Sequence, residues 1–408
     1  MADVAILDVQ LYGESIGTLT RFPDDRILFA FRKSYIDNAD RPILSLSFKD
    51  EFGGLIADFP PTQTAALPFF SNLLPEGQMR KYLAERAKVK PIREFFLLWM
   101  LGQDMPGAVV IRPADGESAP PAINEEDEET ADDQDQEGML RFSLAGVQLK
   151  FSAVNKDRKG LTIPAGGIGG SWIVKLPSRE YKDVPENEFS MMTLAKLVGI
   201  NVPEIKLVPT NKISNLPEGF TSKGQAFVIK RFDRLEGGEA LHIEDFAQVF
   251  RVYPDAKYKR GNMARIAEVI NAESRGQDIE EFIRRLTFNT LIGNADMHLK
   301  NWSIIYPSPT QPRLAPAYDF VSTIPYLPTD EAALKVSRSK LFSEFTDDEL
   351  KHFSANARLS EKIVLDAAYD TVERFHQHWK QQKKDLPISQ EIVQIIEKHL
   401  KTVPIANK

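Results

Sequence analysis

The sequence contains no cysteine among its 408 residues. This absence excludes a disulfide scaffold, a thiolate zinc site, an iron–sulfur cluster and a cysteine nucleophile, and it fits a reducing compartment. No basic segment leads into an apolar one at the N-terminus, so we expect no signal peptide. No apolar run approaches the ~20 residues that a bilayer-spanning helix needs. These absences predict a cytoplasmic protein that does not associate with membranes.

Negative charge is concentrated in one segment. Residues 115–137 contain eleven acidic side chains and no basic one, so the rest of the chain is positive, at +4, although the whole carries −7. The overall acidity therefore does not exclude an acidic ligand such as a nucleotide or DNA. Because like charges repel and few apolar residues are present, we expect residues 114–138 to be a disordered acidic linker. A specific acidic interaction segment is the alternative.

A chain of this length predicts two or three domains. Residues 1–113 combine strand-like runs at 4–12, 16–21, 27–31 and 43–48 with helical spacing at 75–87 and 91–101, which indicates an N-terminal α+β subdomain. Residues 139–234 are mostly strand-like with one helix, whereas residues 235–408 are mostly helical. We therefore expect an α+β protein with two lobes and a cleft between them.

Ten residues carry most of the chemical information. Gly293–Trp302 contains an acid, an imidazole, an ammonium group and two amides, and a second lone acid, Asp319, follows a strand-like run. An Asp followed five residues later by Asn, and then by Asp-Phe, is the order used for phosphoryl transfer by protein kinases. In this interpretation Asp296 accepts the proton of the attacking hydroxyl. Asn301 and Asp319 supply oxygen ligands to magnesium.

Phosphoryl transfer also needs a cation and backbone donors for the phosphates. Lys175 lies in the alternating run Trp172–Leu176 and is placed as the strand lysine of a kinase. Glu188 on the following helix is the expected partner of this lysine, with Glu186 as second choice. The loop Ser143–Gln148 precedes the lysine, as a phosphate-covering turn would. The glycine-rich stretch 166–170 is better interpreted as a flexible hairpin.

These residues resemble the HipA family of serine/threonine kinase toxins, and the resemblance runs nearly end to end. It is carried by short motifs in family order, namely Ser143–Lys150, Ile173–Ser178, Asn187-Glu188, Asn201–Pro203, Val228–Arg234, Glu244–Gln248, Gly293–Asn301 and Tyr318-Asp319. The resemblance implies a bilobal, protein-kinase-like α+β fold with an extra N-terminal α/β subdomain (1–113). It also implies a nucleotide-binding N-lobe core (139–234) and a mostly helical C-lobe with the catalytic loop (235–408).

The resemblance further implies ATP and Mg²⁺ as cofactors, with Asp296 as catalytic base and Asn301 and Asp319 on the metal. Residues 228–233 would form the hinge beside adenine, with Phe232 near the base. The implied ATP-binding residues are Ser143, Ala145, Gly146, Val147, Gln148, Lys175, Glu188, Lys230, Arg231, Phe232, Asp233, His298, Lys300 and Asn301. Two positions depart from ordinary kinases, because His298 replaces a lysine and Val321 replaces the glycine after Asp-Phe. Lys230 stands where the best-known family members are expected to carry an acid.

Regulation and partners also follow from the resemblance. Family members autophosphorylate a loop serine, here Ser143, and the added charge beside the ATP phosphates would shut the site. They pair with a HipB-like helix-turn-helix antitoxin, which binds operator DNA so that the complex represses its own operon. Their protein substrates include aminoacyl-tRNA synthetases.

Two other functions remain open at this point. The chain could be a catalytically silent, kinase-fold co-repressor that works only through its DNA-binding partner. It could also be a metal-dependent hydrolase with Asp296, His298 and Asp319 as ligands, although the other histidines are scattered along the sequence.

Overall fold

The computed structural model describes residues 5–87, 89–114, 150–156, 160–162, 170–178, 180–216 and 224–408. The predicted acidic linker therefore lies outside the described residues except for Ala114, as do the loop 143–148 and most of the glycine-rich stretch. The chain divides into two compact units, which are built from interleaved segments of the sequence.

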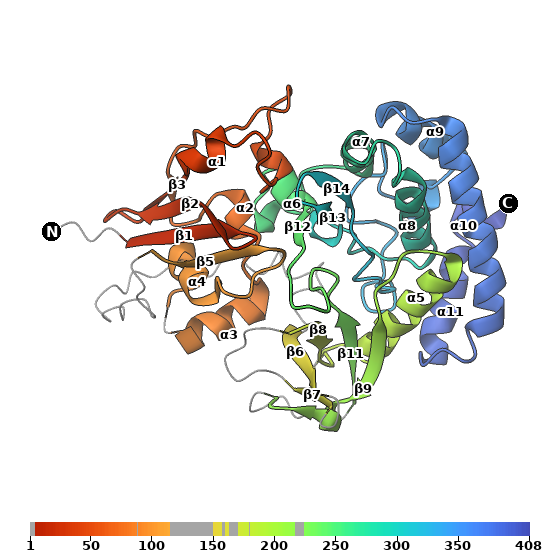
Figure 1. The fold of residues 1–408 in the computed structure, drawn as a ribbon. Coiled ribbons are helices and arrows are strands. Elements are labelled where there is room, and N and C mark those ends of the chain that lie inside the picture. The colour runs from red at the N-terminus through yellow and green to blue at the C-terminus, as the bar shows by residue number, and fades with distance from the viewer. Residues whose placement is uncertain are drawn as a thin grey trace. The chain divides into compact units, whose positions relative to one another are not determined.

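The first unit comprises Met1–Arg141, Asp233–Lys257 and Ser303–Pro312. Its larger sheet is antiparallel, with the strand order β4-β3-β2-β1-β5. Figure 1 shows β3, β2, β1 and β5 of this sheet. The strands are β1 (Ala5–Leu11), β2 (Glu14–Arg21), β3 (Arg26–Phe31), β4 (Thr62–Gln63) and β5 (Val109–Pro113). The accompanying helices are α1 (Lys33–Asp37), α2 (Pro68–Ser71), α3 (Gly77–Ala87) and α4 (Glu94–Leu101).

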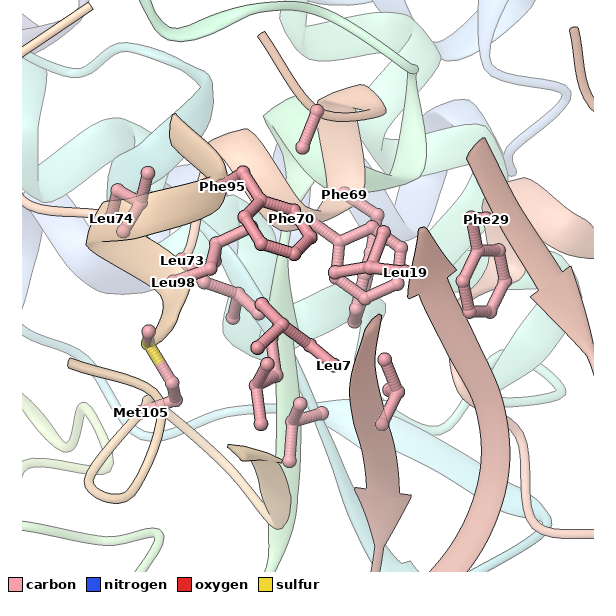
Figure 2. Close-up of a cluster of buried hydrophobic side chains, with 14 of the residues drawn as sticks. Leu7, Leu19, Phe29, Phe69, Phe70, Leu73, Leu74, Phe95, Leu98 and Met105 are labelled. Carbon is pink, nitrogen blue, oxygen red and sulfur yellow. The ribbon is translucent and has the colours of Figure 1, made fainter. Parts of the chain in front are cut away.

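An apolar cluster fills the space between this sheet and its helices. Figure 2 shows Leu7 and Leu19 from the strands beside Phe70 and Phe95 from the helices, and all four side chains are almost fully buried. Alternation along β1 and β2 places one face of the sheet in this cluster, as expected for an antiparallel sheet covered on one side. Burial of apolar surface, at about 25 cal/mol per Å², is the main stabilising contribution here.

One predicted strand of this unit is absent. Residues 43–48 are not a strand, and a 3₁₀ helix, Leu46–Phe48, occupies the end of the run. The hydroxyl of Ser45 accepts a hydrogen bond from the backbone N–H of Ser47 and so caps this turn. A serine that offers the backbone this local partner competes with strand pairing, which the apolar pattern alone did not reveal.

Strands β12 and β13, from the later segments of the first unit, belong to a second, smaller sheet with the order β12-β13-β14. These strands are β12 (His242–Asp245), β13 (Ser303–Ser308) and β14 (Gln311–Leu314), and β12 leads into the short helix α6 (Phe246–Val249). Asp245 and Gln248 form a reciprocal capping box at the start of α6. The division thus differs from the predicted segments, because 233–257 and 303–312 pack with the N-terminal residues. Long-range strand pairing of this kind leaves no mark in local sequence spacing.

The second unit comprises Phe142–Phe232, Tyr258–Trp302 and Arg313–Lys408. Its sheet has the order β10-β7-β6-β8-β11-β9, with β8 antiparallel to both neighbours. The strands are β6 (Lys150–Lys156), β7 (Gly160–Thr162), β8 (Trp172–Lys175), β9 (Ile205–Pro209), β10 (Ile213–Ser214) and β11 (Gln225–Lys230). Helix α5 (Val184–Val198) begins with Pro185 in its first turn and ends at Gly199 in the left-handed conformation.

The rest of this unit is helical, as the sequence predicts. Its helices are α7 (Met263–Glu273), α8 (Ile279–Leu291), α9 (Asp347–Asn356), α10 (Glu361–Gln382) and α11 (Gln390–Leu400). The long helix α10 packs against α8, α5 and α9 (Figure 1). Further 3₁₀ turns of this unit occur at Thr210–Lys212, Leu299–Asn301, Phe342–Glu344 and Pro404–Asn407, and another, Pro254–Ala256, belongs to the first unit. None of the helices in the described part of the chain combines the length and apolar character needed to cross a bilayer.

Candidate active site

Lys175 is the centre of a buried charge cluster in the second unit. It ends β8, its side chain is 5% exposed, and its Nζ donates hydrogen bonds to Glu188 Oε1 and to Asp319 Oδ1. The predicted pair of Lys175 with Glu188 is therefore present, and Asp319 joins it. A strand, the helix that follows it and a segment 144 positions beyond Lys175 thus meet at one ammonium group.

The two carboxylates determine the protonation state of this lysine. Burial by itself lowers the pKa of Lys175, but the charges of Asp319 and Glu188 and their hydrogen bonds raise it well above its usual range. Lys175 is consequently a permanent cation at physiological pH. A fixed positive charge at the end of a strand is what a site for nucleotide phosphates requires.

Asp319 adopts an unusual backbone conformation. Its φ of 58° lies in the left-handed region, which few residues other than glycine occupy. The side-chain Nδ2 of Asn294 donates to the backbone oxygen of Asp319 at 3.3 Å and to Asn289 Oδ1 at 2.8 Å. Asn294 therefore ties the loop that carries Asp296 to the residue that carries the second carboxylate.

The loop after α8 holds Asp296 through its backbone. The backbone oxygen of Asp296 accepts hydrogen bonds from Asn301 Nδ2 at 2.7 Å and from the N–H of His298 at 2.8 Å. The N–H of Asp296 in turn donates to Asn294 Oδ1 at 3.1 Å. These bonds fix the conformation of the loop. Because Asn301 Nδ2 donates to the backbone of Asp296, the side-chain oxygen Oδ1 of Asn301 is the atom that can bind a cation.

His298 and Lys300 occupy different places in this loop. His298 is 1% exposed, and its Nε2 lies 4.0 Å from Asp296 Oδ1. Lys300 is half-buried, and its backbone oxygen accepts a hydrogen bond from the Tyr318 hydroxyl at 2.8 Å. Through Tyr318 the loop is connected once more to the segment that carries Asp319.

The predicted hinge is divided between the two units. The backbone N–H of Lys230 bonds Glu204 O at 2.8 Å, and Arg231 donates from Nη1 to Ser152 Oγ at 3.2 Å. The Phe232 ring lies 5.9 Å from the Tyr318 ring, centroid to centroid, which puts it next to the Asp319 segment.

Asp233 belongs to the first unit, where its buried Oδ2 accepts from Gly107 N–H at 2.9 Å and Arg234 at 2.8 Å. The carboxylate of Asp233 therefore has a structural role there. The remaining predicted ATP-binding residues, Ser143, Ala145, Gly146, Val147 and Gln148, lie outside the described residues.

The residue types of this cluster suit a magnesium–nucleotide complex. Asp319 offers a carboxylate and Asn301 an amide oxygen, both hard ligands that Mg²⁺ prefers, and Lys175 offers the cation for phosphate oxygens. The hydrolase alternative needs a denser ligand set. Within the described ranges no three His, Asp or Glu side chains are grouped so that they could hold a metal ion.

Sequence reasoning missed two contributors to this site. Tyr258 donates its hydroxyl to Asp296 Oδ1 at 2.5 Å, and Thr323 Oγ1 accepts from the N–H of Ala295 at 2.7 Å. Both come from segments without a recognised motif. Asn294, in contrast, is one of the two amides that the sequence analysis counted in Gly293–Trp302.

A strand lysine bound to a helix glutamate, with Asp, Asn and Asp following in that order, defines a kinase-like protein. Residues 7–112 match the family described as HipA N-terminal domain, and residues 142–379 match the HipA-like C-terminal domain. The chain therefore belongs to the HipA family.

Individual relatives agree with this assignment. The chain is 56% identical to a Sinorhizobium fredii protein named "Putative kinase Y4dM", over 99% of this chain and 98% of that one. It is 29% identical to the serine/threonine-protein kinase toxin HipA of Shewanella oneidensis, over 63% of each chain. A solved structure of Shewanella oneidensis HipA with HipB and its operator DNA matches 98% of this chain and 96% of that chain. The TM-score is 0.74 at 23% identity, so this last match concerns the fold alone.

Proposed function

We propose that this chain is an ATP- and Mg²⁺-dependent serine/threonine protein kinase that acts as the toxin of a toxin–antitoxin pair. The observation that carries the proposal is the hydrogen-bonded group of Lys175, Glu188 and Asp319, which lies in the same unit as Asp296 and Asn301. The names of the kinase relatives support it.

Each residue has a distinct task in the proposed reaction. Lys175 binds phosphate oxygens of ATP, and Glu188 keeps its ammonium group in place. Asn301 and Asp319 would hold Mg²⁺, which would supply positive charge to neutralise the phosphates. Asp296 accepts the proton of a serine or threonine hydroxyl while that oxygen bonds to the γ-phosphorus. The bond from phosphorus to the β,γ-bridging oxygen breaks, and ADP leaves.

The finer parts of the proposal rest on family membership. We propose that Ser143 is the autophosphorylation site that turns the kinase off, and that the protein substrate is a translation component such as an aminoacyl-tRNA synthetase. We also propose a HipB-like antitoxin as partner, with operator DNA bound mainly through it. The fold match to HipA, whose solved complex contains HipB and operator DNA, supports this partner.

Mass spectrometry of the purified chain tests the catalytic proposal. From a phosphatase-treated start, incubation with Mg²⁺ and ATP should add one phosphate to Ser143. Asp296→Asn should add none, and Ser143→Ala should lose the modified peptide. The matched control is Asp370→Asn, since Asp370 is a carboxylate of the same unit that pairs with Arg284 on α8, and it should behave as wild type.

The opposite result would favour the co-repressor alternative. If the wild-type chain gains no phosphate and phosphorylates no protein in a bacterial extract, the catalytic proposal is wrong. Operator binding by the complex with its antitoxin, unchanged in Asp296→Asn, would then be its remaining activity.

A further inference from the structure

Tyr258 is the residue whose side-chain hydroxyl contacts the proposed catalytic carboxylate. It lies between the 3₁₀ turn Pro254–Ala256 and α7, and its hydroxyl donates to Asp296 Oδ1 at 2.5 Å. The two residues are 38 positions apart in sequence and belong to the same compact unit. No motif in the sequence marks this tyrosine.

The aromatic ring of Tyr258 makes a second contact with the same loop. It meets the His298 ring edge-on, with 4.9 Å between centroids and 79° between planes. The N–H of His298 is bonded to the backbone oxygen of Asp296. Tyr258 thus holds the loop through its ring and the carboxylate through its hydroxyl.

The backbone on both sides of Tyr258 is anchored. The preceding residue, Lys257, is 5% exposed, and its Nζ bonds Glu76 Oε2 at 2.6 Å within the first unit. On the other side Asn262 caps α7, and the N–H of Met263 donates to Lys335 O at 2.9 Å. A tyrosine fixed at both ends loses little further entropy when it orders the carboxylate.

A hydrogen bond from a phenol to a carboxylate oxygen has two effects. It fixes the rotation of the carboxylate, and it stabilises the ionised form that can accept a proton. Tyrosine ordinarily titrates near pH 10, so its hydroxyl is a donor at neutral pH. A general base must be both ionised and aimed at the hydroxyl that it deprotonates.

We propose that Tyr258 is the positioning residue of the catalytic base and holds the Asp296 carboxylate in one orientation through the bond to Oδ1. This inference rests on the proposed kinase function. The carboxylate also faces a second titratable group, the imidazole of His298, with Nε2 at 4.0 Å from Oδ1. The experiment must therefore observe Asp296 itself as well as turnover.

The test is Tyr258→Phe, which removes the hydroxyl and keeps the ring against His298. We expect kcat to fall about tenfold and KM for ATP to change less than about twofold. Tyr258→Gln, which restores a donor without the ring, should recover part of the lost kcat. It also serves as the second variant if Tyr258→Phe does not fold.

The matched control is Tyr369→Phe. Tyr369 on α10 donates its hydroxyl to Asp347 Oδ2 at 2.7 Å, so this variant removes the same kind of bond in the same unit outside the site. It should leave kcat and KM at wild-type values. A general loss of stability would lower Tm in either variant and would not reduce kcat selectively in Tyr258→Phe.

A second measurement separates this inference from the proposed function. In protein labelled with ¹³Cγ-aspartate, the Asp296 resonance is assigned by its loss in Asp296→Asn, and its chemical shift at pH 7.5 is compared between wild type and Tyr258→Phe. If the resonance moves in Tyr258→Phe and not in Tyr369→Phe, the inference holds even where the wild-type chain transfers no phosphate, and only the kinase proposal fails. If the resonance and kcat both stay at their wild-type values, the inference about Tyr258 is overturned.

Discussion

The side-chain amide of Asn187 exchanges two hydrogen bonds with the backbone of Ser322. Nδ2 donates to Ser322 O at 2.9 Å, and Oδ1 accepts from the Ser322 N–H at 3.1 Å. Asn187 is completely buried and stands directly before Glu188, while Ser322 follows Asp319 by three residues. This amide therefore fastens α5 to the segment of Asp319, so that both carboxylates reach Lys175.

Asn187→Ala should be strongly destabilising. The substitution leaves a buried backbone donor and a buried acceptor without partners, and each costs about 1–3 kcal/mol. We expect the free energy of unfolding in urea to fall by about 2–4 kcal/mol, and the affinity for ATP to fall with it.

The control for Asn187 is Asn356→Ala. Asn356 also donates through Nδ2, to Ser337 Oγ at 2.6 Å, but at the exposed end of α9. Its loss should change the unfolding free energy by no more than about 0.5 kcal/mol. Equal effects of the two variants would show that the bonds to Ser322 do not hold α5.

Lys175→Met should lower the free energy of unfolding, because it leaves the neighbouring carboxylates of Glu188 and Asp319 without a cation. Removal of one member of a buried ion pair typically destabilises by about 3–5 kcal/mol. The carboxylates of Glu188 and Asp319 can escape the penalty by binding protons, so the loss should be larger at pH 7.5 than at pH 5. Urea unfolding at the two pH values measures this difference.

Two further variants test the explanation for Lys175. Lys175→Met combined with Glu188→Gln should regain part of the lost stability at pH 7.5, because one uncompensated charge is gone. Lys206→Met is the control, since Lys206 lies on β9 of the same sheet and pairs with Glu204 at the surface. A pH-independent loss in Lys175→Met would contradict the charge argument.

The buried carboxyl group of Glu244 should make the stability of the protein depend on pH. Burial raises the pKa of this carboxyl to about 7, although Ser45, Tyr306 and the N–H of Leu46 donate to it. The folded state then binds a proton that the unfolded chain releases near pH 4.5. The stabilisation of the folded state by this proton is fully present below about pH 4.5 and is lost as pH rises through about 7.

Glu244→Gln removes this titration and keeps the shape of the side chain. The unfolding free energy of the wild type should decrease by roughly 2–3 kcal/mol relative to Glu244→Gln between pH 4.5 and 7.5. Denaturant titrations at four or five pH values, on both chains, provide the comparison. If the unfolding free energies of the two chains change with pH in parallel, Glu244 is not the source of the pH dependence.

Asp319→Asn and Asp319→Ala should differ in stability but not in function. Asparagine tolerates the left-handed backbone of this position (φ 58°), whereas alanine is strained there by about 1 kcal/mol. Asp319→Ala should therefore be the less stable of the two by about that amount in urea unfolding. Both should lose magnesium-dependent ATP binding in calorimetry, and retained binding in either would remove Asp319 from the metal site.

The sequence predicted the pair of Lys175 with Glu188 because the two residues are close along the chain. Asp296 and Asn301 share one loop, and the helix that carries Glu188 follows the strand of Lys175. A site that needs several residue types at short spacing can be recognised as a motif in the amino-acid sequence. The same reasoning failed for residues 43–48, where a serine side chain caps a 3₁₀ turn within an apolar run.

What the sequence by itself determined is the order of the chemistry along the chain and the helices and strands that carry it. Only the tertiary structure brought Tyr258 to Asp296 and Asn187 to Ser322, across 38 and 135 positions. It also placed residues 233–257 and 303–312 with the N-terminal unit. These contacts join elements through buried hydrogen bonds and strand pairs, whose partners depend on how the chain packs and not on local periodicity.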